Sequence, residues 1–468
     1  MVSTRDNGGM RVVFVTAELA PVATVGGLAA AAAGLVKELR ALGVDVDVVM
    51  PDYGKIELAD EHAVEIDVPA WVGTASIRSG VHDDVGPLHL VRAAGLARPH
   101  PYLQPSGEGW PDNAERFFRF ARTVAAWIDA DPPDVVHLND WHTGPVLAAL
   151  SAPPTVLSIH NLAYQGTTDA RWLTKIGPRG RHYEWWGATN PLSGAIALAD
   201  RIVAVSPNYA AEIMTPEGGF GLDEPLRHRW GAVTGILNGI DTDVWNPAVD
   251  PLIAAPFDRR DLTRRDDNRI ELINRLDLGS TDTSPPLAAV VTRLTDQKGI
   301  DLIEPIVPLL ADIPMRLAML GSGDADLAGR LHELAAQHPE HFAFVEGYDE
   351  SLSHLLFAGS DLYLMPSRFE PCGLTQMQAM RYGSIPVVTA VGGLVDTVPD
   401  ADADPRGGLG FVAARARGED VLAALFRAAR RIRDPRRRGA LQRRGMAVDW
   451  SWRVPALSYR ALYRDLVG

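Results

Sequence analysis

Residues 363–376 hold the densest group of side chains in this chain that could do chemistry. An apolar run ends at Pro366, and a turn then presents Arg368 and Glu370 before Gly373 opens a predicted helix. A carboxylate can hold sugar hydroxyls and can stabilise positive charge that develops on a sugar ring. The first N–H groups of a helix lack internal partners and bind phosphate. This segment therefore has the parts needed to hold a phosphorylated sugar.

Two basic residues, Arg293 and Lys298, lie five positions apart where the apolar run 287–292 passes into a loop. An arginine offers paired donors to a phosphate and a lysine offers a point charge, so together they could neutralise one departing diphosphate. The alternative is a surface ion pair between Arg293 and Asp296. We predict that Arg293 and Lys298 form a clamp, that is, a pair of cations that binds the departing diphosphate.

Length and composition limit the possible classes of protein. The 468 residues, 46% of them hydrophobic, suffice for two domains with sizeable cores. A net charge of −14, from 45 basic and 59 acidic residues, argues against a nucleic-acid partner. The basic run 430–444 has the spacing of a solvated helix face. The single cysteine, Cys372, excludes an internal disulfide and a cysteine metal cluster.

No segment has the character of a membrane span or of a signal peptide. No run of about eighteen uncharged apolar residues occurs, and the start 1–10 is polar. We therefore expect a soluble, cytoplasmic protein with no membrane partner.

Short apolar runs alternate with helical patterns along both halves of the chain, which predicts an α/β fold with parallel sheets. In the first half the expected strands are 11–16, 44–50, 135–138, 155–159 and 202–206. In the second half they are 287–292, 316–320, 342–346, 362–365 and 385–388. We expect two similar doubly wound domains.

The segment 363–376 closely resembles the donor-binding segment of the bacterial glycogen and plant starch synthases, and 291–299 and 158–166 are similar to two further motifs of that family. These enzymes, glycosyltransferase family 5, are retaining transferases of the GT-B fold. The resemblance implies two Rossmann-like domains that face a deep interdomain cleft. We expect an acceptor-side domain at 1–248, a nucleotide-donor domain at 249–448, and a helix at 449–468 that crosses back to the first domain.

The same resemblance implies the roles of individual residues. The catalytic residues would be Arg293, Lys298, Glu370 and His160, the last touching the donor sugar. Donor and nucleotide binding would fall to Gly26, Gly27, Tyr348, Cys372, Gly373, Leu374 and Thr375. The cleft and acceptor side would hold Asp140, Trp141, Asn161 and Asn238. The family needs no metal or cofactor, and none is expected here.

Three of these residues have other interpretations. Glu370 could form a buried ion pair with Arg368, and Cys372 is better interpreted as a packing residue than as a nucleophile. His160 could be an ordinary polar residue after a strand. The neighbouring His142 is as consistent with a structural role as with a functional one.

The first loop departs from the family pattern, which places a lysine and an aspartate where this chain has Thr24 and Ala30. Ser193 and the pair 389–390 also stand where the family usually has basic residues. Losing a cation and a carboxylate from a closed site could each cost several kcal/mol of transition-state stabilisation. The departures therefore favour a changed substrate.

Three functions are compatible with this pattern. The expected one is transfer of a sugar or a cyclitol from an ADP- or GDP-type donor to a small sugar or amino-sugar acceptor, as in the pseudo-glycosyltransferases of acarbose-like natural-product pathways. The alternative is an authentic ADP-glucose-dependent glycogen synthase that extends (1→4)-α-glucan. A non-catalytic glucan- or nucleotide-binding protein is disfavoured, because binding alone would not need Arg293, Lys298 and Glu370 together.

Overall fold

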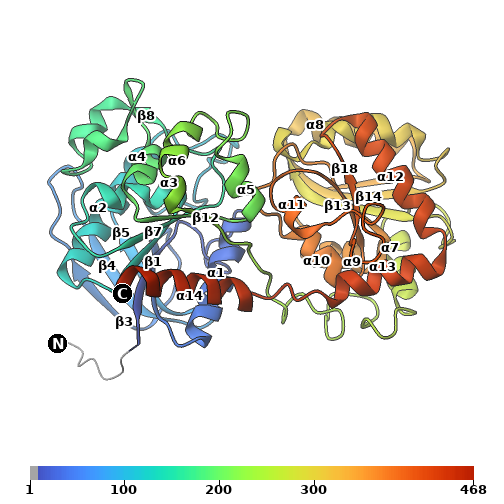
Figure 1. Ribbon diagram of the computed structural model, residues 1–468, viewed down its shortest axis with the longest axis horizontal. Helices are drawn as coiled ribbons and strands as arrows, with labels where there is room; N and C mark the ends of the chain where they lie inside the picture. Colours follow the sequence, from blue (N-terminus) through green and yellow to red (C-terminus); the bar gives the residue numbers. More distant parts are fainter. Residues whose placement is uncertain (1–8) are drawn as a thin grey trace. The chain divides into compact units, whose positions relative to one another are not determined.

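The computed structural model describes residues 9–468, so most of the polar start used above lies outside the described residues. The chain divides into two compact units. The first joins the chain up to Gly239 with Trp452–Gly468, and the second is Ile240–Ser451 (Figure 1). These divisions fall after Gly239 and Ser451, whereas the sequence suggested divisions after 248 and 448.

The first unit is built on a nine-stranded sheet in the order β12-β11-β7-β6-β1-β2-β5-β4-β3. Its strands are parallel from β12 to β5, and β4 and β3 extend it in antiparallel fashion. The strands are β1 Arg11–Val15, β2 Asp45–Pro51, β3 Ala59–Glu65, β4 Ser76–His82, β5 Gly86–Arg92, β6 Val135–Asn139, β7 Thr155–Ile159, β11 Arg201–Ala204 and β12 Val233–Gly235. A separate small sheet consists of β8 Thr168–Asp169, β9 Glu184–Trp185 and β10 Ala188–Thr189.

The helices of the first unit pack apolar faces toward these strands. In α1, for example, Leu28, Leu35 and Leu39 recur at helical spacing and are buried. The α-helices are α1 Gly27–Ala41, α2 Asn113–Ala130, α3 Asp140–Thr143, α4 Pro191–Leu198, α5 Pro207–Glu212, α6 Asp223–His228 and α14 Arg453–Val467. The 3-10 helices are η1 Gly144–Ala148, η2 Ala170–Thr174, η3 Gly180–Tyr183 and η4 Trp230–Ala232.

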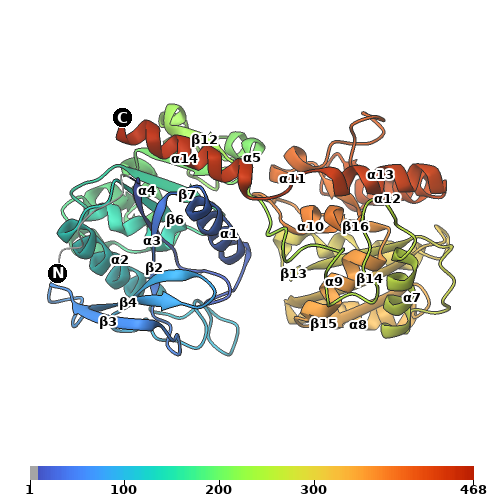
Figure 2. The same ribbon diagram turned by 90° about the horizontal axis from the view of Figure 1, so that it is seen from below.

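The C-terminal helix α14 belongs to the first unit and lies alongside α1 (Figures 1 and 2). The Tyr463 hydroxyl lies 2.6 Å from Nδ1 of the buried His137. A Cβ on Gly34 of α1 would strike the Trp452 ring, so only glycine fits there. The end of the chain is thus part of the core of the first unit.

The second unit is built on a six-stranded parallel sheet in the order β15-β14-β13-β16-β17-β18. Its strands are β13 Leu287–Leu294, β14 Arg316–Gly323, β15 Phe342–Glu346, β16 Leu362–Met365, β17 Ile385–Thr389 and β18 Phe411–Ala413. Its α-helices are α7 Arg265–Arg275, α8 Ala325–Gln337, α9 Glu350–Gly359, α10 Thr375–Arg381, α11 Gly392–Thr397, α12 Gly418–Ile432 and α13 Pro435–Ala447. Its 3-10 helices are η5 Asp296–Lys298, η6 Ile300–Leu302 and η7 Glu304–Leu309.

In both sheets the chain first builds outward on one side and then returns to build on the other. The reversal occurs between β1 and β6 in the first unit and between β13 and β16 in the second. Ligands of such sheets bind at this switch point, beyond the carboxyl ends of the strands. The prediction of an α/β fold with two doubly wound parallel sheets is confirmed. None of the helices in the described part of the chain is long and apolar enough to cross a bilayer.

Candidate active site

Two loops of the second unit meet at its switch point. One follows β13 and holds Gln297 and Gly299, and the other follows β16. The Arg368 N–H donates to the Gln297 carbonyl at 2.8 Å, and the Gln297 side-chain amide donates to the Phe369 carbonyl at 3.2 Å. Gly299 has φ of 62°, and a Cβ there would strike the Pro366 carbonyl oxygen. The loops are thus joined through their backbones.

Lys298 and Glu370, which are 72 positions apart in the sequence, form an ion pair where these loops meet. The Lys298 Nζ lies 2.6 Å from the Glu370 Oε2, and the Ser367 hydroxyl donates to the same oxygen at 3.0 Å. The two side chains are only 16% and 7% exposed. Oε1 of Glu370 has no hydrogen-bond partner among the described residues, so it can accept from a sugar hydroxyl.

The alternative interpretation of Glu370 named the wrong partner. Arg368 donates to both carboxylate oxygens of Asp301, at 2.8 and 2.7 Å, and also approaches Asp296 at 3.2 Å. The ion pair of Arg293 with Asp296 is likewise not formed. Arg293 is exposed, and its guanidinium makes no ion pair with any residue that the structure describes. It is therefore available to an anion.

The turn before α10 is held by a side chain that the sequence analysis missed. Gln376 donates from Nε2 to the carbonyls of Cys372 and Gly373, at 3.1 and 3.0 Å. Gly373 has φ of 72°, and a Cβ there would strike the Gln376 Oε1. These contacts hold the turn directly before α10, a helix whose first N–H groups have no partner inside the helix. Cys372 is buried, as a packing residue would be.

A second glycine loop, which follows β17 and contains Gly392 and Gly393, contacts the backbone of Glu370. The Gly393 N–H donates to the Glu370 carbonyl at 3.0 Å, and a Cβ on Gly392 would strike that oxygen. The Thr389 hydroxyl donates to the Ser367 carbonyl at 2.5 Å. The pair Gly392-Gly393, three residues after the end of β17, is the feature of the sequence that could have indicated this loop. Thr389, noted above only as a departure from the family, thus has a structural role.

Tyr348 follows β15 and is 86% exposed, so its ring is open to a planar partner such as a nucleotide base. The preceding Gly347 has φ of 122°, a conformation in which a side chain would be strained.

At the switch point of the first unit, Asp140 ties together the loops after β6 and β7. Its carboxylate accepts the N–H groups of His160 and Asn161, at 2.7 and 3.4 Å. Asp140 is 7% exposed with φ of 56°. Burial raises the pKa of this carboxyl to about 7, although the two N–H groups oppose the shift. Asp140 therefore shapes the His160 loop.

His160 is held as a neutral imidazole. Its Nε2 lies 2.9 Å from the Asn139 side-chain oxygen, while the Asn139 amide group donates to the Val15 carbonyl at 2.9 Å. Because Asn139 presents an oxygen, Nε2 carries the proton and Nδ1 is left as an acceptor. Burial lowers the pKa of His160 to about 4. The ring can accept a hydrogen bond from a sugar hydroxyl at neutral pH.

Trp141 and His142 lie in an aromatic cluster. Their rings stack at 4.1 Å, and His142 also stacks on Tyr102 at 4.8 Å. Each is 8% exposed, and a Cβ on Gly166 would strike the Trp141 ring. Burial lowers the pKa of His142 to about 3. These contacts favour a packing role for His142.

The first glycine loop is anchored by Glu18, which the sequence analysis also missed. One carboxylate oxygen of Glu18 accepts the N–H groups of Val25 and Gly26, both at 2.9 Å, and the other accepts the Tyr102 hydroxyl at 2.7 Å. Gly26 precedes α1, whose first residue is Gly27. A Cβ on Gly26 would meet no atom within 4 Å, so there is open space there.

The two departures from the family pattern, Thr24 and Ala30, are exposed. Asn238 is buried after β12, two residues before the chain passes into the second unit at Ile240.

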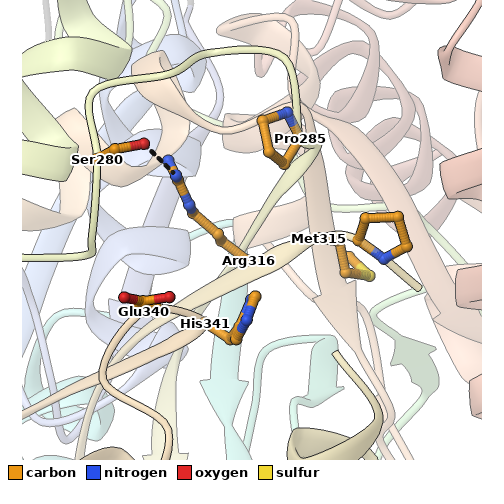
Figure 3. Close-up of a pocket in the computed structure, with 7 residues that line it drawn as sticks. Ser280, Pro285, Met315, Arg316, Glu340 and His341 are labelled. Atoms are coloured by element: carbon orange, nitrogen blue, oxygen red, sulfur yellow. Dashed lines mark hydrogen bonds between the residues drawn. The ribbon is translucent and has the colours of Figure 1, made fainter. Parts of the chain in front are cut away.

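A cavity of about 170 Å³ in the second unit lies away from these residues (Figure 3). It is lined where β14 and β15 begin, whereas Arg293 lies at the end of β13 and Glu370 follows β16. Arg316 crosses it and donates to the Ser280 hydroxyl at 3.3 Å. Among the described residues, no group of three His, Cys, Asp or Glu side chains could hold a metal ion.

Comparison with known proteins agrees with this geometry. Residues 11–228 match the starch synthase catalytic domain family, and residues 279–429 match the glycosyl transferases group 1 family. The chain is 41% identical to glycogen synthase 1 of Methylococcus capsulatus, over 98% of this chain and 97% of the relative. It is 40% identical to glycogen synthase 2 of Bradyrhizobium diazoefficiens, over 98% of each.

Solved structures give the same result. The catalytic domain of starch synthase IV from Arabidopsis thaliana, bound to ADP and acarbose, superposes with a TM-score of 0.89 at 34% identity, over 98% of this chain and 99% of that one. Sucrose-phosphate synthase from Thermosynechococcus elongatus, at 19% identity with a TM-score of 0.63, shares the fold.

The fold and these matches define a glycosyltransferase of the GT-B class. Within it, the chain belongs to the glycogen and starch synthase family. The comparisons favour the glycogen synthase alternative over the redirected, pseudo-glycosyltransferase interpretation, which they do not support.

Proposed function

We propose that the protein transfers glucose, with retention of configuration, from ADP-glucose to the end of a (1→4)-α-glucan. One observation carries the proposal: the Lys298–Glu370 pair is intact in a chain that matches glycogen synthases at 40–41% identity over its whole length. The ADP-bound starch synthase with the same fold supports the choice of nucleotide. A cytoplasmic location stays a prediction.

The residues divide the work of the reaction between leaving group and sugar. Arg293 and Lys298 stabilise the charge that builds on the departing diphosphate, and the N–H groups of Leu374 and Thr375 bind its oxygens. Glu370 holds sugar hydroxyls through Oε1 and stabilises the positive charge on the ring. His160 accepts a sugar hydroxyl at Nδ1, Gly26 and Gly27 leave room for the donor, and Tyr348 stacks on the base.

On the acceptor side, we propose roles for four residues of the first unit. Asp140, Asn161 and Trp141 shape the loop on which His160 lies, and Asn238 is placed near the acceptor only by its family motif.

Two measurements test the proposal. In a thermal-shift series with ADP, GDP, UDP and dTDP, we expect ADP to stabilise the protein most, because stabilisation follows the logarithm of ligand concentration over Kd. With labelled ADP-glucose and glycogen, we expect incorporation at roughly 10 per second, the median for enzymes on their own substrates. Preference for another nucleotide, or no labelled glucan, would reject the proposal.

The exposed Thr24 and Ala30 favour a second candidate, transfer of a sugar or cyclitol to a small sugar or amino-sugar acceptor. The double variant Thr24→Lys with Ala30→Asp separates the two. Both positions are exposed, so the charges should not disturb folding. A glycogen synthase should extend glycogen at least as fast with the family residues restored. An enzyme adapted to another substrate should show no gain.

A further inference from the structure

Arg316, the first residue of β14, is a buried cation without an ion-pair partner. Only 6% of it is exposed, and its guanidinium donates to two neutral groups, the Asp282 carbonyl at 3.0 Å and the Ser280 hydroxyl at 3.3 Å. None of the carboxylates among the described residues forms an ion pair with it. A charge that leaves water costs free energy unless it is paired. Burial and the nearby charge of Arg269 both lower the pKa of Arg316, so an anion beside this guanidinium would relieve an unfavourable charge.

The Arg316 side chain has both free donors and space beside them. A guanidinium carries five N–H donors, and the two contacts above leave three of them for a ligand. The side chain lines the cavity of about 170 Å³ that Figure 3 shows. A cavity of about 150 Å³ holds a benzene molecule, so this one has room for about six non-hydrogen atoms.

The rest of the lining is partly polar and partly apolar. His341, the residue before β15, lines the cavity, and its Nδ1 is buried without a hydrogen-bond partner among the described residues. Such a nitrogen can donate to a bound molecule or accept from it. Pro285, Pro314 and Met315 add apolar surface. The lining suits a molecule with an anionic end, one hydrogen-bonding group and a short apolar part.

We propose that this cavity binds a small monocarboxylate, with its carboxylate on the Arg316 guanidinium and a hydroxyl or similar group at His341. A planar guanidinium matches a planar carboxylate through two parallel hydrogen bonds. Glu340 also lines the cavity and is exposed. Its negative charge repels a dianion such as phosphate more strongly than a monoanion, which favours the monocarboxylate.

The cavity is separate from the candidate active site. It lies where β14 and β15 begin, whereas Arg293 lies at the end of β13 and Glu370 follows β16. The eight residues of β14 place its two ends about 23 Å apart, at about 3.3 Å per residue. A molecule that fills the cavity cannot span that distance. The monocarboxylate site is therefore independent of the proposed transfer reaction.

Thermal denaturation at constant ionic strength tests the proposal with lactate as the probe and lactamide as its neutral counterpart of the same size. A ligand of the folded protein raises the melting temperature, and the dependence on its concentration gives the Kd. We expect saturable stabilisation by lactate, none by lactamide, and no change in the Kd for lactate when ADP is in excess. Absence of a saturable lactate effect, an equal effect of lactamide, or competition by ADP would overturn the inference.

Three variants locate the site. Arg316→Gln should raise the Kd for lactate about tenfold or more, the scale of a lost charge-assisted hydrogen bond. Glu340→Gln should lower it about threefold, because a nearby exposed negative charge is removed. Arg330→Gln is the matched control and should leave it unchanged, since Arg330 is a half-exposed arginine of the same unit that pairs with Glu304 and does not line the cavity.

An unchanged Kd in Arg316→Gln, or an equal rise in Arg330→Gln, would overturn the inference. Glu340 is exposed, so its variant should fold even if Arg316→Gln does not, and an unchanged Kd in Glu340→Gln would also overturn it. Inorganic phosphate tests the choice of ligand class: it should stabilise the unmodified protein and Arg316→Gln equally. A loss in Arg316→Gln that is larger for phosphate than for lactate would reject the monocarboxylate.

Discussion

Lys298 and Glu370 form a buried ion pair, whereas Arg293 has no ion-pair partner among the described residues. The lysine is largely buried against the carboxylate, whereas the Arg293 guanidinium is exposed and unpaired among the described residues. Removing either cation should weaken catalysis, but only one removal leaves a buried charge without its partner.

We therefore predict that Arg293→Ala and Lys298→Ala each lower kcat about a hundredfold or more at saturating donor. Lys298→Ala should also lower the free energy of unfolding by about 2 kcal/mol or more, because Glu370 stays buried. Urea denaturation checks this, with Arg293→Ala as the control that should not change. Adding Glu370→Gln to Lys298→Ala should recover most of the stability. Unchanged kcat in both single variants would contradict the clamp.

Asp140 gives a prediction about pH. Its folded-state pKa of about 7 lies above the ordinary aspartate value, so between about pH 4 and 7 the unfolded chain releases a proton that the folded protein retains. The carboxyl therefore favours folding at low pH, and this contribution is lost as the pH rises through that window. The Asp140→Asn variant would lack the effect, and asparagine tolerates positive φ.

We predict that Asp140→Asn becomes more stable relative to the unmodified protein as the pH rises from about 4 to about 7. Urea denaturation at several pH values measures the difference. Other groups, including His160, titrate in both proteins and cancel in the comparison. A difference that does not change with pH would contradict the raised pKa.

The three loops that follow β13, β16 and β17 are packed against one another and joined by hydrogen bonds. Gly299, Gly373 and Gly392 each occupy a place where a Cβ would strike a neighbouring loop or side chain. Their absence of a side chain is what lets the three loops approach closely.

We predict that Gly373→Ala raises the KM for the donor and lowers kcat/KM by about tenfold or more. A displaced turn would bind the donor phosphates less well, and a loss of about 1.4 kcal/mol of transition-state stabilisation is enough for a tenfold effect. Steady-state kinetics check this. Gly329→Ala in α8 is the control, since a Cβ there meets no atom within 4 Å and alanine favours a helix. Equal kinetics for the two variants would contradict a special role for the Gly373 turn.

In the proposed reaction, groups of the protein itself neutralise the charge of the leaving diphosphate. Arg293, Lys298 and the N–H groups before α10 supply positive potential where a divalent ion would otherwise act. We predict that transferase activity measured with excess EDTA equals activity without it. Loss of activity on chelation, restored by magnesium or manganese, would show that these groups do not suffice.

The fold class could be predicted from the amino-acid sequence alone, and the candidate site residues were proposed from the same local features. Strand periodicity, glycine positions and the family motifs are local features, and local backbone preferences follow directly from them. The segments 291–299 and 363–376 lie at the switch point of their sheet, and 158–166 follows β7, the strand next to the switch point of the other sheet.

The pairing of these residues, in contrast, could be seen only in the folded protein. Lys298 rather than Arg368 pairs with Glu370, Gln376 and Glu18 hold the glycine turns, and Asp140 fixes the His160 loop. Each of these contacts depends on how sheet topology brings distant loops together, and on burial, which shifts a pKa only once the chain has folded. Spacing along a sequence carries no information about either.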